Sequence, residues 1–128
     1  MSELEPAWRQ MILVVDDTPD NLSMISGLLK DAYRVKVATN GERALAIAAG
    51  DPKPDLILLD IMMPEIDGFE VCRRLKLSED TRTIPVVFLS AKTEEAERKR
   101  GLEVGAIGYL CKPVDPRELL AEVSSHLA

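Results

Sequence analysis

Short runs of nearly unbroken apolar residues constrain the fold of this chain more than any other feature. They cover residues 12–15, 56–59 and 86–89, with a weaker run at 107–111. Strands that are buried on both faces of a sheet have this pattern, whereas half-exposed strands alternate apolar and polar residues. Residues 33–38 do alternate, with Val35 and Val37 each following a charged residue, Arg34 and Lys36, which predicts a strand near the sheet edge.

Helical segments separate the predicted strands. Thr18 before Pro19 and Asp115 before Pro116 each combine a helix N-cap with proline at the first helical position. The predicted helices cover residues 19–29, 40–49, 69–77, 93–104 and 115–127. Because strand and helix alternate with short links, the sequence predicts a three-layer α/β domain with a parallel sheet and right-handed crossovers.

Length, charge and cysteine content narrow the class of protein. The 128 residues fit one domain, predicted at residues 10–128, after an N-terminal extension at residues 1–9. A net charge of −6 argues against direct nucleic-acid binding, which requires a basic face. No apolar run reaches the roughly 20 residues that span a membrane, and the polar N-terminus is unlike a signal peptide. We interpret Cys72 and Cys111 as free thiols in the reducing cytoplasm.

The scarcity of histidine excludes two common catalytic systems. The chain has one histidine, His126, close to the C-terminus. Serine–histidine and cysteine–histidine catalysis would therefore require the last helical turn to be part of an active site.

Polar residues follow the predicted core strands. Asp16, Asp17, Asp60, Ser90 and Lys112 are the first polar residues after the strands at 12–15, 56–59, 86–89 and 107–111. In an open parallel sheet these carboxyl ends share one edge, where ligands bind beside the point at which strand order reverses. Any one of the five residues could be an ordinary strand end, but the set as a whole indicates a ligand-binding site.

The chemistry of this set is specific. Three crowded carboxylates raise one another's pKa, and a hard divalent cation such as Mg²⁺ relieves the repulsion while sharing a substrate phosphate. Lys112 adds a positive charge suited to phosphate oxygens, and Ser90 adds a hydroxyl donor. Asp60 could then attack phosphorus and form an aspartyl phosphate. Asp16 and Asp17, taken alone, fit a helix N-cap as well as a metal site.

At these positions the sequence resembles the receiver domain of bacterial two-component response regulators. The matching motifs, spaced as in that family, are Val14-Val15-Asp16-Asp17, Asp60-Ile61-Met62-Met63-Pro64, Asp67-Gly68, Ser90-Ala91, Gly105-Ala106 and Lys112-Pro113. The resemblance covers roughly residues 10–127. It implies a flavodoxin-like, doubly wound, five-stranded parallel sheet of order 2-1-3-4-5.

The resemblance also implies a metal site. Asp60 would be the phosphoacceptor. Asp17 and Asp60 would bind Mg²⁺ directly, with Mn²⁺ as a substitute. The backbone carbonyl of Met62 would be a third ligand, and Asp16 would act through water.

Further residues would bind and sense the phosphoryl group. The resemblance implies that Lys112 contacts it and that Ser90 moves to hydrogen-bond one of its oxygens. Tyr109 would swing inward at the same time, and the Lys112-Pro113 peptide bond would be cis. We add the hypothesis that Met62 and Lys92 flank the acyl phosphate and set its hydrolysis rate by controlling access of water.

The resulting hypothesis is a phosphorylation-controlled switch. A sensor histidine kinase or a histidine phosphotransfer protein would donate the phosphoryl group. The domain would catalyse its own phosphorylation, also from small phosphodonors, and its own dephosphorylation, without being a conventional enzyme. The face built from residues 93–104, 107–111 and 115–127 would contact an output domain or effector, or a second copy in a phosphorylation-dependent homodimer.

Two alternatives remain at this stage. A phosphatase of the haloacid-dehalogenase family would need a second acid two residues after its nucleophile, where this chain has Met62. A pseudo-receiver, which binds a partner without phosphorylation, would be expected to lack an acid or the lysine. Residues 101–127 look similar to receivers that precede cyclic-di-GMP enzymes, which would place an output domain outside this sequence.

Overall fold

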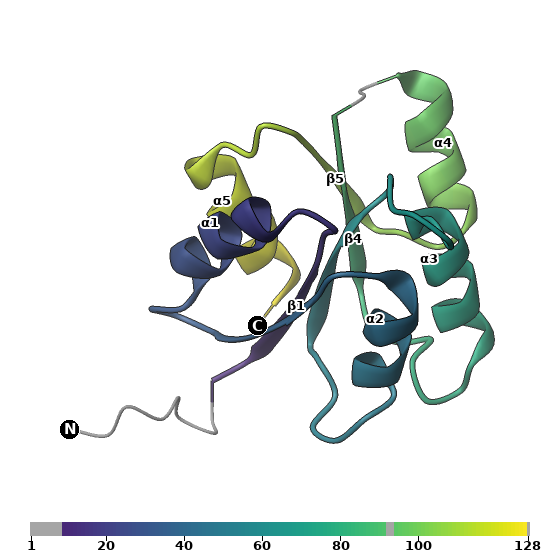
Figure 1. Ribbon diagram of the computed structural model, residues 1–128, viewed down its shortest axis with the longest axis horizontal. Coiled ribbons are helices and arrows are strands. Elements are labelled where there is room, and N and C mark those ends of the chain that lie inside the picture. Colours follow the sequence, from purple (N-terminus) through teal and green to yellow (C-terminus); the bar gives the residue numbers. More distant parts are fainter. Residues whose placement is uncertain (1–8, 92–93, 128) are drawn as a thin grey trace.

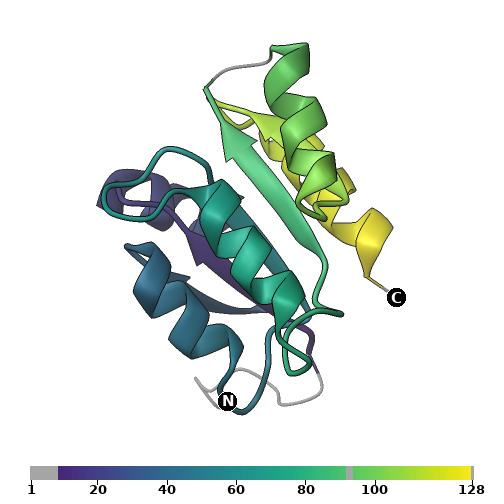
Figure 2. The ribbon, with the colours of Figure 1, turned by 90° about the vertical axis from the view of Figure 1, so that its right-hand side faces the viewer.

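The computed structural model describes residues 9–91 and 94–127 and contains one parallel sheet of strand order β2-β1-β3-β4-β5. The strands are β1 (Met11–Val15), β2 (Arg34–Ala38), β3 (Leu56–Asp60), β4 (Val86–Ser90) and β5 (Gly108–Cys111). The helices are α1 (Pro19–Leu29), α2 (Gly41–Ala48), α3 (Gly68–Leu77), α4 (Glu95–Glu103) and α5 (Pro116–His126). Helices α1 and α5 cover one face of the sheet, and α2, α3 and α4 cover the other (Figures 1 and 2). The predicted fold class and strand order are confirmed.

The unbroken apolar runs belong to strands that are buried on both faces. Successive side chains of β1 alternate between two hydrophobic layers, Ile12 and Val14 toward α1 and α5, Leu13 and Val15 toward α2 and α3. The hydrophobic core therefore consists of two clusters of buried residues, one on each face of the sheet. Strand β2 lies at the sheet edge, as its alternation predicted, and Val37 there is 45% exposed.

Three helix starts differ in detail from the sequence prediction. Thr18 and Asp115 occupy the N-cap positions of α1 and α5, but neither side chain makes a capping hydrogen bond. Thr18 donates its own backbone N–H to Asp16 Oδ1 at 2.9 Å, which ties the start of α1 to the acid that follows β1. Helix α4 begins at Glu95, and its predicted start at Thr93 lies outside the described residues.

A tight turn fixes the chain after β3. A Cβ atom at Gly68 would lie 2.4 Å from the Asp60 carbonyl oxygen, so only glycine allows this approach. The Gly68 N–H donates to the Ile61 carbonyl at 2.8 Å, and Asp67 Oδ1 caps α3 by accepting from Glu70 N at 2.9 Å. The start of α3 is therefore packed directly against the end of β3.

Both cysteines are free thiols, as expected. Cys72 is buried in α3 and donates to the Val104 carbonyl, and Cys111 in β5 is half-buried. None of the helices in the described part of the chain is long and apolar enough to cross a membrane. The division between an extension at 1–9 and a domain at 10–128 stays a prediction, because residues 1–8 lie outside the described residues.

Candidate functional site

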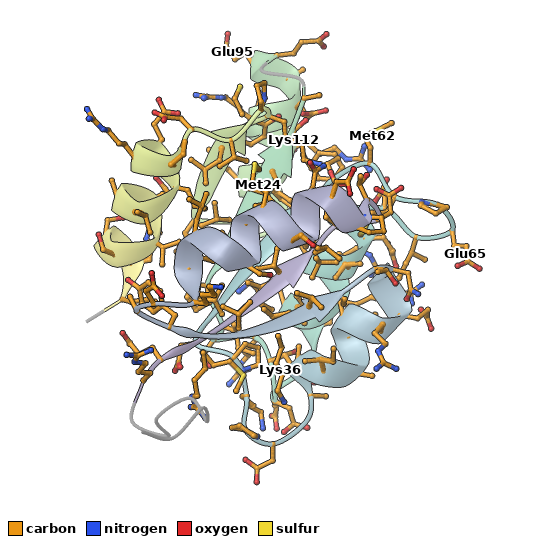
Figure 3. The ribbon with its side chains drawn as sticks, turned by 60° about the vertical axis from the view of Figure 1, so that its left-hand side comes forward. Met24, Lys36, Met62, Glu65, Glu95 and Lys112 are labelled. Atoms are coloured by element: carbon orange, nitrogen blue, oxygen red, sulfur yellow. The ribbon has the colours of Figure 1, made fainter. Side chains whose placement is uncertain are left out.

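The carboxyl ends of four strands bring the predicted site residues to one edge of the sheet, which we call the carboxyl edge. Asp16 and Asp17 follow β1, Asp60 and Ser90 are the last residues of β3 and β4, and Lys112 follows β5. The side chains of Lys112 and Met62 are labelled at this edge in Figure 3.

Asp16, Asp17 and Asp60 form an acid cluster. One oxygen from each carboxylate lies within 4.8 Å of the others. Asp16 and Asp60 are 0% and 3% exposed, while Asp17 is open to solvent. Two buried carboxylates beside a third require positive charge nearby, because burial and mutual repulsion both disfavour ionisation.

Lys112 supplies part of that charge. Its Nζ lies 2.7 Å from Asp16 Oδ2 and 3.1 Å from Asp60 Oδ1, so it bridges two members of the acid cluster. Burial lowers the pKa of Lys112, but the two carboxylates outweigh it and the net pKa is raised, which keeps the ammonium charged. Asp16 is further held by the Thr18 N–H and by Asn21 Nδ2 at 3.4 Å.

Asp60 is the most perturbed acid of the site. Burial and the charge of Asp16 raise its pKa from 3.8 to about 6, against the opposing effects of Lys112 and of the Met62 backbone hydrogen bond. The positive charge of Lys112 therefore does not fully offset the effects of burial and of the neighbouring carboxylate on Asp60. Hard oxygen donors with residual negative charge fit a divalent cation such as Mg²⁺, and the exposed Asp17 leaves the cluster open for its entry.

A second cluster lies beside the acids and consists of Ser90, Glu97 and Tyr109. Ser90 is 1% exposed, and its Oγ donates to Glu97 Oε1 at 2.6 Å. The Tyr109 hydroxyl donates to the same carboxylate oxygen. Burial first, and then the Glu97 hydrogen bond, raise the pKa of Tyr109 to about 12, so the phenol stays protonated.

Two residues of the site, Glu97 and Asn21, were not predicted from the sequence. Both lie on helices that follow a core strand, seven residues after Ser90 and five after Asp16. A polar residue in the first turn of such a helix is near the carboxyl edge, but whether it faces the site depends on how the helix is rotated. Met62 is 62% exposed at the rim of the site, and Lys92 lies outside the described residues. The Lys112–Pro113 peptide bond is cis, as is Asp51–Pro52.

An acid cluster bridged by a lysine lies at the carboxyl edge of a doubly wound sheet, where its oxygen donors fit a divalent cation. Comparison with known proteins gives the family. The sequence model of the protein family described as the response regulator receiver domain matches residues 12–124 of this chain. The chain therefore belongs to the response regulator receiver family and acts in two-component signal transduction. Receiver domains bind Mg²⁺ in an acidic pocket and work with kinases and output domains.

Relatives carry this domain within longer proteins. The chain is 45% identical over 116 residues to a "Probable cyclic di-GMP phosphodiesterase" of Vibrio cholerae, and 49% identical over 115 residues to the response regulator PleD of Caulobacter vibrioides. These matches cover 91% and 89% of this chain but only 26% and 25% of the relatives. The phosphate regulon transcriptional regulatory protein PhoB of Pseudomonas aeruginosa is 47% identical over 91% of the chain and 51% of its own length.

A solved structure confirms the architecture. The chemotaxis protein CheY4 of Vibrio cholerae superposes with a TM-score of 0.88 at 33% identity, over 93% of this chain and 99% of that protein. The chain thus spans a quarter to a half of the longer relatives, but nearly the whole of CheY4.

Proposed function

We propose that Asp60 is the phosphoacceptor and takes its phosphoryl group from a phosphohistidine. The donor would be a sensor histidine kinase or a histidine phosphotransfer protein. An Asp60 carboxylate oxygen attacks phosphorus, the phosphorus–nitrogen bond breaks, and the histidine nitrogen takes a proton. The observation that carries this proposal is the contact of Asp60 with Lys112 at 3.1 Å inside the acid cluster, at the carboxyl end of β3.

The cation of the proposal is Mg²⁺, with Mn²⁺ as a substitute. Asp17 and Asp60 would bind it directly, the Met62 carbonyl would be a third ligand, and Asp16 would act through water. When bound, it neutralises negative charge on the carboxylates and the phosphoryl oxygens. This assignment is supported by the hard oxygen donors of the acid cluster and by the raised pKa of Asp60, to which burial contributes most and the charge of Asp16 next.

Lys112 and Ser90 complete the phosphoryl site. The ammonium of Lys112 binds one phosphoryl oxygen, and the hydroxyl of Ser90 donates to another after moving toward Asp60. Tyr109 turns inward as Ser90 leaves. This step is supported by an apolar pocket of about 200 Å³ that Tyr109 lines together with Phe88 and Gly101.

We assign recognition of the phosphorylated state by partners to the face formed by α4, β5 and α5. Leu102, Ile107 and Leu120 are large apolar residues on or beside these elements, and they are 66%, 46% and 39% exposed. Movement of Tyr109 would change this face and so its contact with an output domain, an effector or a second copy of the chain. Output domains outside this sequence are supported by the longer relatives, and a cytoplasmic location by the two free cysteines.

Intact-mass spectrometry after incubation with acetyl phosphate and Mg²⁺ tests the proposal. We expect the wild-type protein to gain one phosphoryl group, and we expect no gain in Asp60→Asn or in the presence of EDTA. An Asp60→Asn protein that is still phosphorylated would place the acceptor elsewhere. A wild-type protein that gains no phosphoryl group and binds no beryllofluoride would favour the pseudo-receiver alternative.

A further inference from the structure

Glu97 contacts both residues of the proposed switch. Its Oε1 atom accepts from Ser90 Oγ at 2.6 Å and also from the hydroxyl of Tyr109. Glu97 lies in the first turn of α4, whereas Ser90 ends β4 and Tyr109 lies in β5. One carboxylate oxygen therefore links three elements beside the acid cluster.

The hydrogen bond from Ser90 to Glu97 competes with binding of a phosphoryl oxygen. A serine hydroxyl has one proton to donate, so it cannot serve the carboxylate and the phosphoryl group together. The distance of 2.6 Å is typical of a charge-assisted bond to a carboxylate, which is about twice as strong as a neutral one. Because Ser90 is buried, water cannot readily replace Glu97 as its acceptor.

Tyr109 is held by the same helix from two sides. Its hydroxyl donates to Glu97, and the next residue of α4, Arg98, places its guanidinium carbon 5.1 Å from the centre of the tyrosine ring. This cation–π contact keeps the ring against α4. When Ser90 leaves Glu97, the contacts of Tyr109 with Glu97 and Arg98 remain, so both residues of α4 oppose inward movement of the ring.

We propose that Glu97 is a positioning residue that holds Ser90 and Tyr109 in the unphosphorylated arrangement and thereby opposes the switch. The inference rests on the function proposed above for Asp60 and Ser90. Phosphorylation must transfer the Ser90 hydrogen bond from Glu97 to a phosphoryl oxygen. Loss of the Glu97 carboxylate therefore favours the phosphorylated arrangement without altering the acid cluster or Lys112.

Affinity for beryllofluoride, a mimic of the phosphoryl group, measures this effect. At fixed Mg²⁺ we expect Glu97→Ala to bind beryllofluoride about 3- to 10-fold more tightly than wild type, as expected for release of one charge-assisted hydrogen bond. Glu97→Gln should fall between the two, because its amide oxygen still accepts but carries no charge. Glu95→Gln removes the same charge from an exposed position of the same turn, labelled in Figure 3, and should stay within about twofold of wild type.

A double-mutant cycle with Ser90→Ala separates positioning from simple charge removal. If Glu97 acts through the Ser90 hydroxyl, most of the gain from Glu97→Ala disappears when Ser90 is alanine. A gain that survives in the Ser90→Ala background overturns the inference, as does equal or weaker binding by both Glu97 variants. Wild-type protein that binds no beryllofluoride would instead overturn the proposed function itself, so the two failures are distinguishable.

Discussion

At the scale of single residues, the site stores negative charge that the protein alone does not neutralise. Asp60 shows this most clearly, because burial and the neighbouring Asp16 raise its pKa even though Lys112 lies 3.1 Å away. A residue selected only for stability would not be an acid that is buried beside a second acid, because ionising it there costs free energy. In the proposed function, the same negative charge would attract a cation to the carboxylate that attacks phosphorus.

Replacing Asp60 with asparagine should stabilise the metal-free protein. The pKa is about 6 in the folded chain against 3.8 as the ordinary value, so the folded state binds more protons and stability falls as pH rises between these values. In EDTA at pH 7.5 we expect Asp60→Asn to raise the free energy of unfolding by about 1–3 kcal/mol, and clearly less at pH 5. The charged groups facing residue 60, namely Asp16, Asp17 and Lys112, remain in the variant. Urea unfolding at both pH values measures the effect, and a gain independent of pH would contradict this explanation.

The exposed side chain of Met62 tests control of hydrolysis. Met62 follows Asp60 by two residues and is 62% exposed at the rim of the site. If it limits access of water to the acyl phosphate, Met62→Ser should shorten the phosphoprotein lifetime by about 2- to 5-fold, an effect below one kcal/mol of barrier height. The lifetime is followed by intact mass after removal of the donor. Met24→Ser, an exposed methionine of α1 that lies near a different rim of the site, serves as the control, and equal lifetimes in all three proteins would end the hypothesis.

Some residues of the site could be predicted from the sequence, and others could not. Asp16, Asp60, Ser90 and Lys112 could be found because each ends or directly follows an apolar strand, and parallel strands bring their carboxyl ends together. Glu97 could not, because its contact depends on the rotation of α4 about its own axis. Sequence spacing does not determine that rotation, especially in a helix with one buried residue, Gly101.

At the scale of secondary structure, the turn from β3 to α3 positions the proposed nucleophile. The Gly68 backbone lies against the Asp60 carbonyl and the Ile61 Cα, so the start of α3 supports the end of β3. The sequence motif identified this turn, because glycine after Asp67 is a strong turn signal. It could not reveal the close contact, which joins two backbones eight residues apart.

Gly68→Ala should therefore destabilise the protein and disturb the site. A Cβ at this position would lie 2.4 Å from the Asp60 carbonyl oxygen and 2.8 Å from the Ile61 Cα, both backbone atoms with little freedom to move. We expect a loss of about 2–4 kcal/mol in the free energy of unfolding. Gly27→Ala is the matched control, since a Cβ there has nothing within 4 Å and alanine favours the helix, so we expect a change of about 0–1 kcal/mol in the stabilising direction. Chemical denaturation of both variants decides the point, and equal effects would show that the close contact relaxes freely.

At the scale of the whole molecule, two hydrophobic layers, one on each face, hold the strands of the sheet in place. The charged residues of the acid cluster and Lys112 lie at the carboxyl edge. This division explains why the three-layer α/β class could be predicted from the apolar runs and the helical segments between them, because burial of β1, β3 and β4 on both faces requires helices on both sides of the sheet. The strand order was implied by the family resemblance. The same division also explains why ligand binding should be visible as global stability. A cation that binds only the assembled acid cluster stabilises the folded state in proportion to the logarithm of its concentration.

Mg²⁺ should therefore raise the melting temperature, and Asp17 should be required for the effect. Residue 17 is the exposed member of the acid cluster, so its replacement removes a proposed ligand without burying new surface. If 10 mM Mg²⁺ exceeds the dissociation constant about tenfold, it adds about 1.4 kcal/mol to the stability of wild type, which shifts the melting temperature by a few degrees. Asp17→Asn should lose most of this shift. Asp31→Asn, an exposed aspartate beyond the opposite end of α1, should keep all of it. A shift of equal size in all three proteins would mean that Mg²⁺ acts by general charge screening, and the cation would then have to be assigned to another site.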